Sequence, residues 1–113
     1  MGFKIDRIAS NFVKEISYIL ATEIRDDDIK FVTVTDCKVT NDLSFAKVYV
    51  TVLDENKKDS TLKALNEAKK FIRRVLADRV EVRHIPELEF VYDESIEYGK
   101  KIENIIEDIH NNE

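Results

Sequence analysis

Glycine is nearly absent from this 113-residue sequence, which contains only Gly2 and Gly99. Phosphate-binding P-loops and dinucleotide-binding turns need glycines clustered between a strand and a helix, because the backbone must approach the phosphates closely. A nucleophile elbow needs glycines on both sides of its serine, and no serine here has them at that spacing. The sequence therefore argues against these classes of enzyme.

Cysteine and histidine, which dominate zinc sites, are also scarce. Cys37 is the only cysteine, so an internal disulfide and a cysteine-based zinc site are excluded, and we expect it to act as a small buried hydrophobe. His84 and His110 lie far apart and lack partners at metal-ligand spacing. The acidic triplet at residues 26–28 lacks the glycine and the alternating ligands of a calcium loop. We expect no metal, no cofactor and no enzymatic activity.

Long apolar runs are missing as well. None approaches the roughly 18 residues that a membrane-spanning helix needs, and the segment from Gly2 to Leu20 has charges in every turn, unlike a signal peptide. The length of 113 residues suits one domain. A cytoplasmic protein without a membrane partner is the expectation, as a monomer.

Charge is distributed unevenly along the chain. The formal net charge of −5 argues against a nucleic-acid partner. Residues 57–84, however, contain nine basic and four acidic residues, whereas residues 85–113 contain two basic and nine acidic ones. Because salt screens charges beyond about 8 Å, a partner responds to the local surface rather than to the total. The basic segment is therefore a candidate anion site, although a solvated helix face gives the same pattern.

Hydrophobic periodicity predicts three helices and three strands. The expected elements are helix 5–24, strand 31–39, strand 45–53, helix 60–78, strand 87–92 and helix 95–109, followed by a polar tail from about residue 110. Ser60 or Thr61 is expected to cap the second helix. This order predicts an α+β fold, with a three-stranded sheet and helices packed on one face. We expect a single domain over residues 1–113.

Basic residues on the second helix are the strongest candidates for a binding site. Lys69 and Arg73 are four residues apart, as are Lys70 and Arg74, so each pair should stack on the helix surface and point away from the core. Arginine can hold phosphate oxygens with two hydrogen bonds, and lysine acts as a point charge. The expected RNA-binding strip consists of Lys63, Lys69, Lys70, Arg73, Arg74, Arg79 and Arg83.

Two long runs, residues 29–53 and 62–93, resemble the ribosome-binding factor A family. The most specific pieces are Val-Thr-Asp at 34–36, Asp-Leu-Ser with Ala-Lys-Val-Tyr at 42–49, and Pro-Glu-Leu with Phe and Asp at 86–93. The resemblance covers nearly the whole chain. It implies a type II KH-like domain that binds the free small (30S) ribosomal subunit and assists late maturation of its 16S rRNA near the 5′-terminal helix. It also implies a role in growth in the cold.

The family's Ala-x-Gly helix kink aligns with residues 68–70, where Ala68 agrees and Lys70 replaces the glycine. Because a left-handed lysine costs about 1 kcal/mol or more, we expect a gentler bend, with a nearly continuous helix from Ser60 to Asp78. Asp27 and Asp28 replace the usual proline and arginine of the family, which weakens the loop after the first helix as an RNA contact.

Two alternatives remain open from the sequence. The acidic residues 85–113 could form a protein-interaction surface for a partner with a basic tail, such as a ribosomal protein. A small hydrolase using His84 and a nearby carboxylate is the other alternative, and the expected loop position of His84 argues against it.

Overall fold

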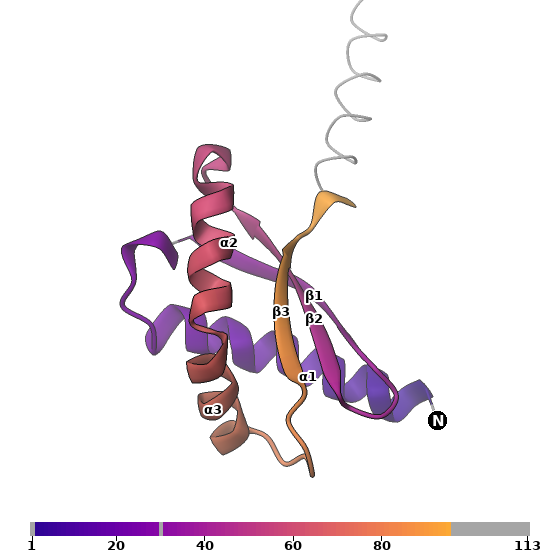
Figure 1. The fold of residues 1–113 in the computed structure, drawn as a ribbon. Helices are drawn as coiled ribbons and strands as arrows, with labels where there is room; N and C mark the ends of the chain where they lie inside the picture. The colour runs from indigo at the N-terminus through magenta and orange to yellow at the C-terminus, as the bar shows by residue number, and fades with distance from the viewer. Residues whose placement is uncertain (1, 30, 96–113) are drawn as a thin grey trace, which may run out of the picture.

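The computed structural model describes residues 2–29 and 31–95. The elements in chain order are α1 (Gly2–Thr22), β1 (Val32–Val39), β2 (Phe45–Val52), α2 (Lys58–Glu67), α3 (Lys69–Arg79) and β3 (Glu87–Tyr92), with short 3-10 turns at Asp27–Ile29 and Glu55–Lys57. Figure 1 shows this arrangement. The predicted α+β fold is confirmed. The last predicted helix and the polar tail lie outside the described residues.

The three strands form one sheet in the order β1-β2-β3. β1 and β2 pair antiparallel as the predicted hairpin, with an irregularity between Val34 and Asp36. β3 pairs with β2 in parallel, with Val48 opposite Phe90. A parallel pair needs a long crossover, and α2 and α3 supply it. β3 is therefore an edge strand of the sheet.

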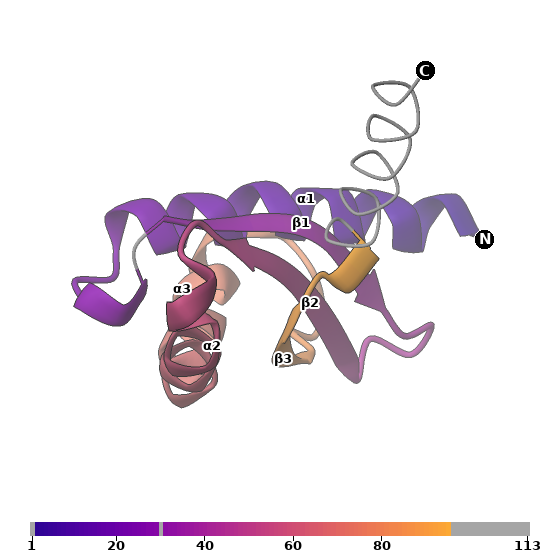
Figure 2. The ribbon, with the colours of Figure 1, turned by 90° about the horizontal axis from the view of Figure 1, so that it is seen from above.

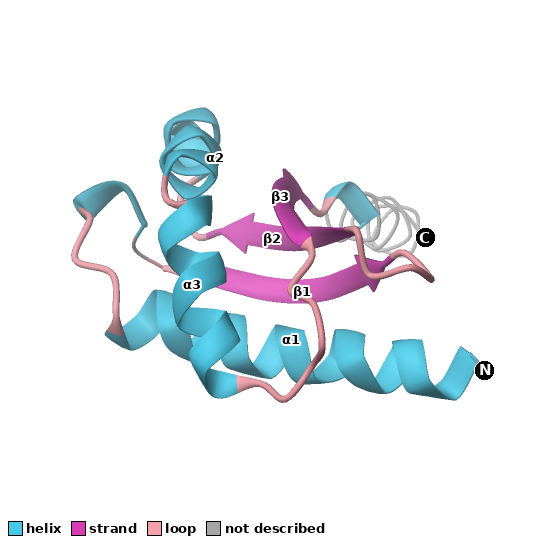
Figure 3. Cartoon of the chain, turned by 60° about the horizontal axis from the view of Figure 1, so that its bottom comes forward, coloured by secondary structure: helices cyan, strands magenta, loops and turns pink. Residues whose placement is uncertain are grey.

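The helices cover one face of this sheet, as predicted. α1 runs beside β1, while α2 and α3 pack near β3 (Figures 2 and 3). Alternate residues of the strands point into the core, and their neighbours are exposed on the opposite face. The core is built from buried apolar side chains of all these elements. Its largest fully buried members are Phe12, Ile16, Ile19, Val48, Val50, Leu65, Ile72 and Leu76.

The β1–β2 turn is held by side-chain hydrogen bonds to Asp42. Its Oδ1 accepts from the hydroxyls of Thr40 and Ser44 and from the Ser44 backbone N–H. These bonds favour the carboxylate and lower its pKa to about 2. The turn should therefore keep these bonds above about pH 4 and lose them as the pH falls through about 2. The turn also holds Leu43 at φ 60°, in the left-handed region.

The second helix begins earlier than predicted. α2 starts at Lys58, directly after the 3-10 turn, and neither Ser60 nor Thr61 caps it. The side chain of Asp54 caps the 3-10 turn instead, by accepting from the Asn56 backbone N–H. Ser60 donates its hydroxyl to the Lys57 carbonyl from within the helix. The polar stretch expected to be a loop thus initiates the helix.

Asn66 fastens α2 to the free edge of β3. Its Oδ1 accepts from the Phe90 backbone N–H at 3.1 Å, and its Nδ2 donates to the Phe90 carbonyl at 3.1 Å. Nδ2 also contacts the Leu62 carbonyl at 3.1 Å. The side-chain amide thus pairs with β3 as a neighbouring strand residue would, which protects an otherwise open edge. Nothing in the sequence pattern singled out this residue.

Replacing Asn66 with alanine should destabilise the protein by about 1–3 kcal/mol, because it leaves two half-buried backbone groups of Phe90 without partners. Urea denaturation monitored by circular dichroism measures this loss. Asn56→Ala, an exposed amide next to α2, is the matched control and should change stability by less than about 0.5 kcal/mol. Equal stabilities of the two variants would contradict the role of Asn66.

Candidate nucleic-acid interface

The crossover helix is interrupted at Ala68. This residue ends α2 and begins α3, with φ −88° and ψ 0°. Its N–H donates to the carbonyls of both Ala64 and Leu65, at 3.0 and 3.1 Å, and its own carbonyl accepts from Ile72. This shared donor is typical of a locally tightened turn. Ala68 is half-buried against the core, so its small side chain suits this position.

α2 and α3 thus meet at the residue where the kink was expected, and the prediction of a nearly continuous helix from Ser60 to Asp78 is wrong. The reason lies in the backbone. Among the described residues, only Phe31 and Leu43 have positive φ, so the break at Ala68 uses right-handed geometry alone. Lys70 lies within α3. A lysine at this position therefore bears none of the strain expected from a left-handed conformation.

Introducing glycine at position 70 should destabilise the protein by about 1 kcal/mol, because glycine is unfavourable inside a right-handed helix. Thermal unfolding of Lys70→Gly measures the effect. Lys70→Ala is the matched control, which removes the same charge and retains helix propensity. A glycine variant at least as stable as the alanine variant would show that position 70 prefers the left-handed region.

Three of the predicted cations are exposed beside the break. Lys69, Lys70 and Arg74 all have exposed side chains. The Arg74 guanidinium lies 5.5 Å from the centre of the Phe71 ring. The Phe71 side chain is 37% exposed, although the ring is apolar. We call Lys69, Lys70, Phe71 and Arg74 the kink patch.

Arg73 has a different role from the one predicted. It is half-buried, and its Nη2 donates to the Ile85 carbonyl at 2.6 Å. Its Nε donates to the same carbonyl at 3.1 Å and contacts the Pro86 carbonyl at 3.2 Å. The expectation that Arg73 points to solvent is therefore wrong. Its guanidinium binds the segment that leads into β3.

Helix geometry explains the positions of both Phe71 and Arg73. At about 100° per residue, Phe71 and Arg73 lie on either side of the fully buried Ile72, at the two edges of the buried face of α3. A side chain at the edge of the buried face can point toward the core or toward solvent. Arg73 turns inward because two backbone carbonyls face it, whereas Phe71 remains partly exposed next to Arg74.

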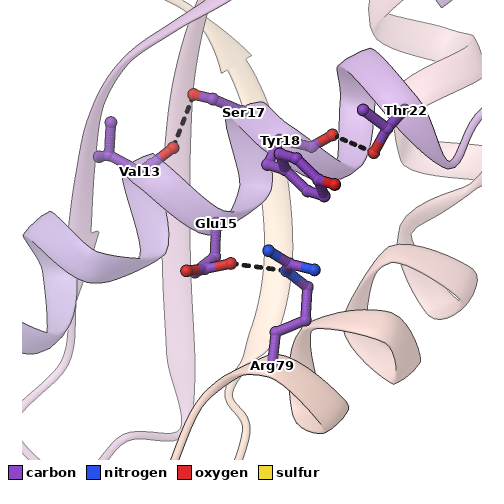
Figure 4. A network of polar contacts seen from close by, with 6 residues as sticks. All are labelled: Val13, Glu15, Ser17, Tyr18, Thr22 and Arg79. Atoms are coloured by element: carbon purple, nitrogen blue, oxygen red, sulfur yellow. Dashed lines mark hydrogen bonds and ion pairs between the residues drawn. The ribbon is translucent and has the colours of Figure 1, made fainter.

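Arg79 connects α3 to α1. Its Nε lies 2.6 Å from Glu15 Oε2, in an ion pair, and its guanidinium stacks over the Tyr18 ring at 4.2 Å (Figure 4). Both side chains of the ion pair are partly shielded from solvent, with exposures of 34% and 16%. These contacts occupy the Arg79 guanidinium, so it is less available to a phosphate than the charged groups of the kink patch.

The remaining two predicted cations flank this helix pair. Lys63 is exposed on α2, before the break. Arg83 is exposed beyond the end of α3, where it shares a cleft with Lys4 and Arg7 of α1. The structure thus leaves Lys69, Lys70 and Arg74 exposed near the break, whereas Arg73 and Arg79 form structural contacts.

The kink patch combines the two features that single-stranded RNA recognition uses. Cations bind backbone phosphates, and an exposed aromatic ring offers a platform for a base.

Elsewhere, burial and the nearby Asp36 raise the pKa of Cys37 to about 12, so it remains a buried thiol at neutral pH. No group of three metal-ligating side chains occurs within residues 2–29 and 31–95.

Comparison with known proteins identifies the family. A family model described as ribosome-binding factor A matches residues 4–106. The ribosome-binding factor A of Staphylococcus carnosus (strain TM300) is 49% identical over 108 residues, which cover 95% of this chain and 94% of that protein. The chain belongs to the ribosome-binding factor A family.

Solved structures of ribosome-binding factor A extend the likeness to the fold. The crystal structure from Thermus thermophilus has a TM-score of 0.70 at 25% identity, over 78% of this chain and 93% of that one. Thermus thermophilus coordinates fitted into a cryo-EM map of a 30S–RbfA complex have a TM-score of 0.68 at 24% identity, over 80% of this chain and 96% of that one. The type II KH-like fold expected for the ribosome-binding factor A family is confirmed. Within the described residues, no helix is long and apolar enough to span a membrane.

Proposed function

We propose that this protein binds the free small ribosomal subunit through its 16S rRNA and assists late maturation of that RNA, near its 5′-terminal helix. It acts by binding, as a cytoplasmic monomer without a cofactor, and catalyses no reaction. Family membership supports the ribosomal partner, as does the 30S complex of the Thermus thermophilus protein. Growth in the cold is where its loss should matter most.

The kink patch is the observation that carries the RNA-binding proposal. Lys69, Lys70 and Arg74 form no ion pair with any carboxylate of the described residues, and the Arg74 guanidinium lies beside the partly exposed ring of Phe71. Like charges held this close together repel one another, and RNA phosphates relieve that repulsion. Lys63 adds a further cation before the break. A protein with a net charge of −5 can thereby present a locally basic surface to RNA.

The protein-interaction alternative has less support. Its acidic surface was assigned to residues 85–113, and most of that segment lies outside the described residues. Within the described part, Glu87 and Glu89 are exposed on the open face of the sheet, as strand alternation predicted. The hydrolase alternative depends on His84. This residue is exposed in the loop before β3, and no described side chain forms with it the hydrogen bond that a hydrolytic site would need.

Sucrose-gradient co-sedimentation tests the proposed function. We expect the purified protein to migrate with isolated 30S subunits and to be absent from 50S and 70S fractions. Deleting the gene should slow growth more at low temperature than at the optimum and lead to accumulation of 16S rRNA with an unprocessed 5′ end. Equal association with all ribosomal fractions, or none, would overturn the proposal. Binding to RNA-free ribosomal proteins, but not to 30S subunits, would favour the acidic-surface alternative.

A further inference from the structure

A second group of cations lines a cleft at the other end of the helical layer. The cleft has a volume of about 830 Å³ and lies between the first half of α1, the β1–β2 turn and the segment after α3. Lys4 and Arg7 come from α1, and Arg83 comes from the segment after α3. Residues far apart in the sequence thus place three positive side chains around one opening.

These three cations are available to a ligand. All three are exposed, and within the described part of the chain none of them has a hydrogen bond or an ion pair. Arg73 and Arg79, by contrast, are engaged by protein groups. Glu81 supplies the single carboxylate among the described residues that line the cleft. The cleft is therefore locally positive on a chain whose net charge is −5.

The position of Lys4 and Arg7 on α1 reinforces this point. The first turn of α1 contains no acidic residue. A helix N-terminus carries a partial positive charge that repels cations and attracts anions. Lys4, in the first turn, therefore opposes the stability of the free helix. A bound phosphate would be attracted by the helix end and by both side chains.

The walls of the cleft are apolar and firmly held. Ile8, Leu43 and Val82 line it. The backbone of Leu43 is left-handed, at φ 60°, and is fixed by the turn in which Asp42 accepts three hydrogen bonds. A bulky residue persists in this conformation only where its surroundings enforce it. The cleft thus combines a preformed apolar wall with a cationic rim.

We propose that this cleft binds one nucleotide of a single-stranded RNA segment. Lys4, Arg7 and Arg83 hold its phosphate, and the ribose or base lies on the apolar wall. This inference rests on the proposed function and deepens it, because it gives the RNA a second contact beyond the end of α3, away from the kink patch. Two linked contacts increase the overall affinity more than either alone.

Titration of the 15N-labelled protein with octauridylate tests the cleft directly. We expect the amide signals of Asn11 and Val82, which line the cleft, to shift on addition of RNA. In the Arg7→Ala/Arg83→Ala variant these shifts should be lost, while those of the kink patch remain. The matched control, Arg25→Ala/Lys57→Ala, removes two exposed cations elsewhere and should keep the cleft shifts. Absence of cleft shifts in the wild-type protein, or their survival in the cleft variant, would overturn the proposal.

Two further measurements separate the possible partners. Addition of octaglutamate should leave the amide signals of the cleft unchanged. Shifts as large as those caused by octauridylate would assign the cleft to an acidic peptide and overturn the RNA proposal. With 30S subunits, the cleft variant should bind with a salt slope of log K lower by about 0.7, because one phosphate contact is lost. An unchanged salt slope in a cleft variant that still binds 30S subunits would overturn the proposed nucleotide site but not the proposed function. Failure of the wild-type protein to bind 30S subunits would overturn the proposed function, and the octauridylate titration would still decide the cleft.

Discussion

Replacing Lys69, Lys70 and Arg74 together with alanine should weaken binding to 30S subunits by about 100-fold, which corresponds to about 2.8 kcal/mol. Each neutralised phosphate contributes about 0.7–0.9 to the slope of log K against log salt. The slope should therefore fall by about 2. Stability should be unchanged or slightly higher, because alanine is the best helix former and the three side chains are exposed. Binding measured from low to high salt, between roughly 50 and 300 mM, gives both quantities.

A matched triple variant separates local charge from total charge. Arg25→Ala/Lys47→Ala/Lys57→Ala also removes three exposed cations, so it changes the net charge equally while sparing the kink patch. It should lose less than about threefold in affinity through the weaker overall field. Comparable losses in both variants would show that the net charge, rather than the kink patch, controls binding.

Phe71→Ala probes the other half of the kink patch. Loss of a base-stacking platform costs about 1–3 kcal/mol, but it removes no charge, so the salt slope should remain that of the wild-type protein. Fluorescence anisotropy with labelled single-stranded RNA measures both. An unchanged affinity would leave Phe71 as a partly exposed member of the hydrophobic layer.

Much of this architecture follows from residue patterns. Apolar alternation is visible in β2, where Ala46, Val48 and Val50 are buried between exposed or half-buried neighbours. The period of α1 likewise places Phe12 and Ile16 in the core. These patterns can be recognised within the sequence of a single helix or strand, because one face of each element is apolar. They predict the elements and the buried face, and the three strands then require helices on that face.

Long-range contacts could not be predicted in the same way. Asn66 pairs with Phe90, 24 positions away, and Arg83 shares a cleft with Lys4 and Arg7, which are 79 and 76 positions away. The sequence does not show which backbone group a polar side chain at the edge of a helix face will contact. Sequence spacing therefore predicts one strip that contains seven of the nine cations of the basic segment. The structure places three of them in the kink patch, two in structural contacts, Arg83 at the rim of a separate cleft and Lys63 on α2 before the break.

The second large effect concerns Arg73. Arg73→Met keeps most of the aliphatic stem and removes the guanidinium, so the carbonyls of Ile85 and Pro86 lose their charged donor. Hydrogen bonds to charged groups contribute about 1.5–3 kcal/mol. We therefore expect a loss of about 2–3 kcal/mol in the free energy of unfolding, measured by urea denaturation. Arg73→Lys should restore only part of it, because an ammonium group cannot reproduce the planar geometry of these bonds.

Arg74→Met is the matched control, since it changes the neighbouring, exposed arginine in the same way. It should alter stability by less than about 0.5 kcal/mol and lower the salt slope of 30S binding by about 0.7–0.9. Arg73→Met should show the opposite pair of results, with reduced stability and an unchanged slope. A stable Arg73→Met variant with a lower slope would return Arg73 to the RNA interface. We expect the two adjacent arginines to differ in function, because α3 turns one toward the backbone before β3 and the other toward solvent.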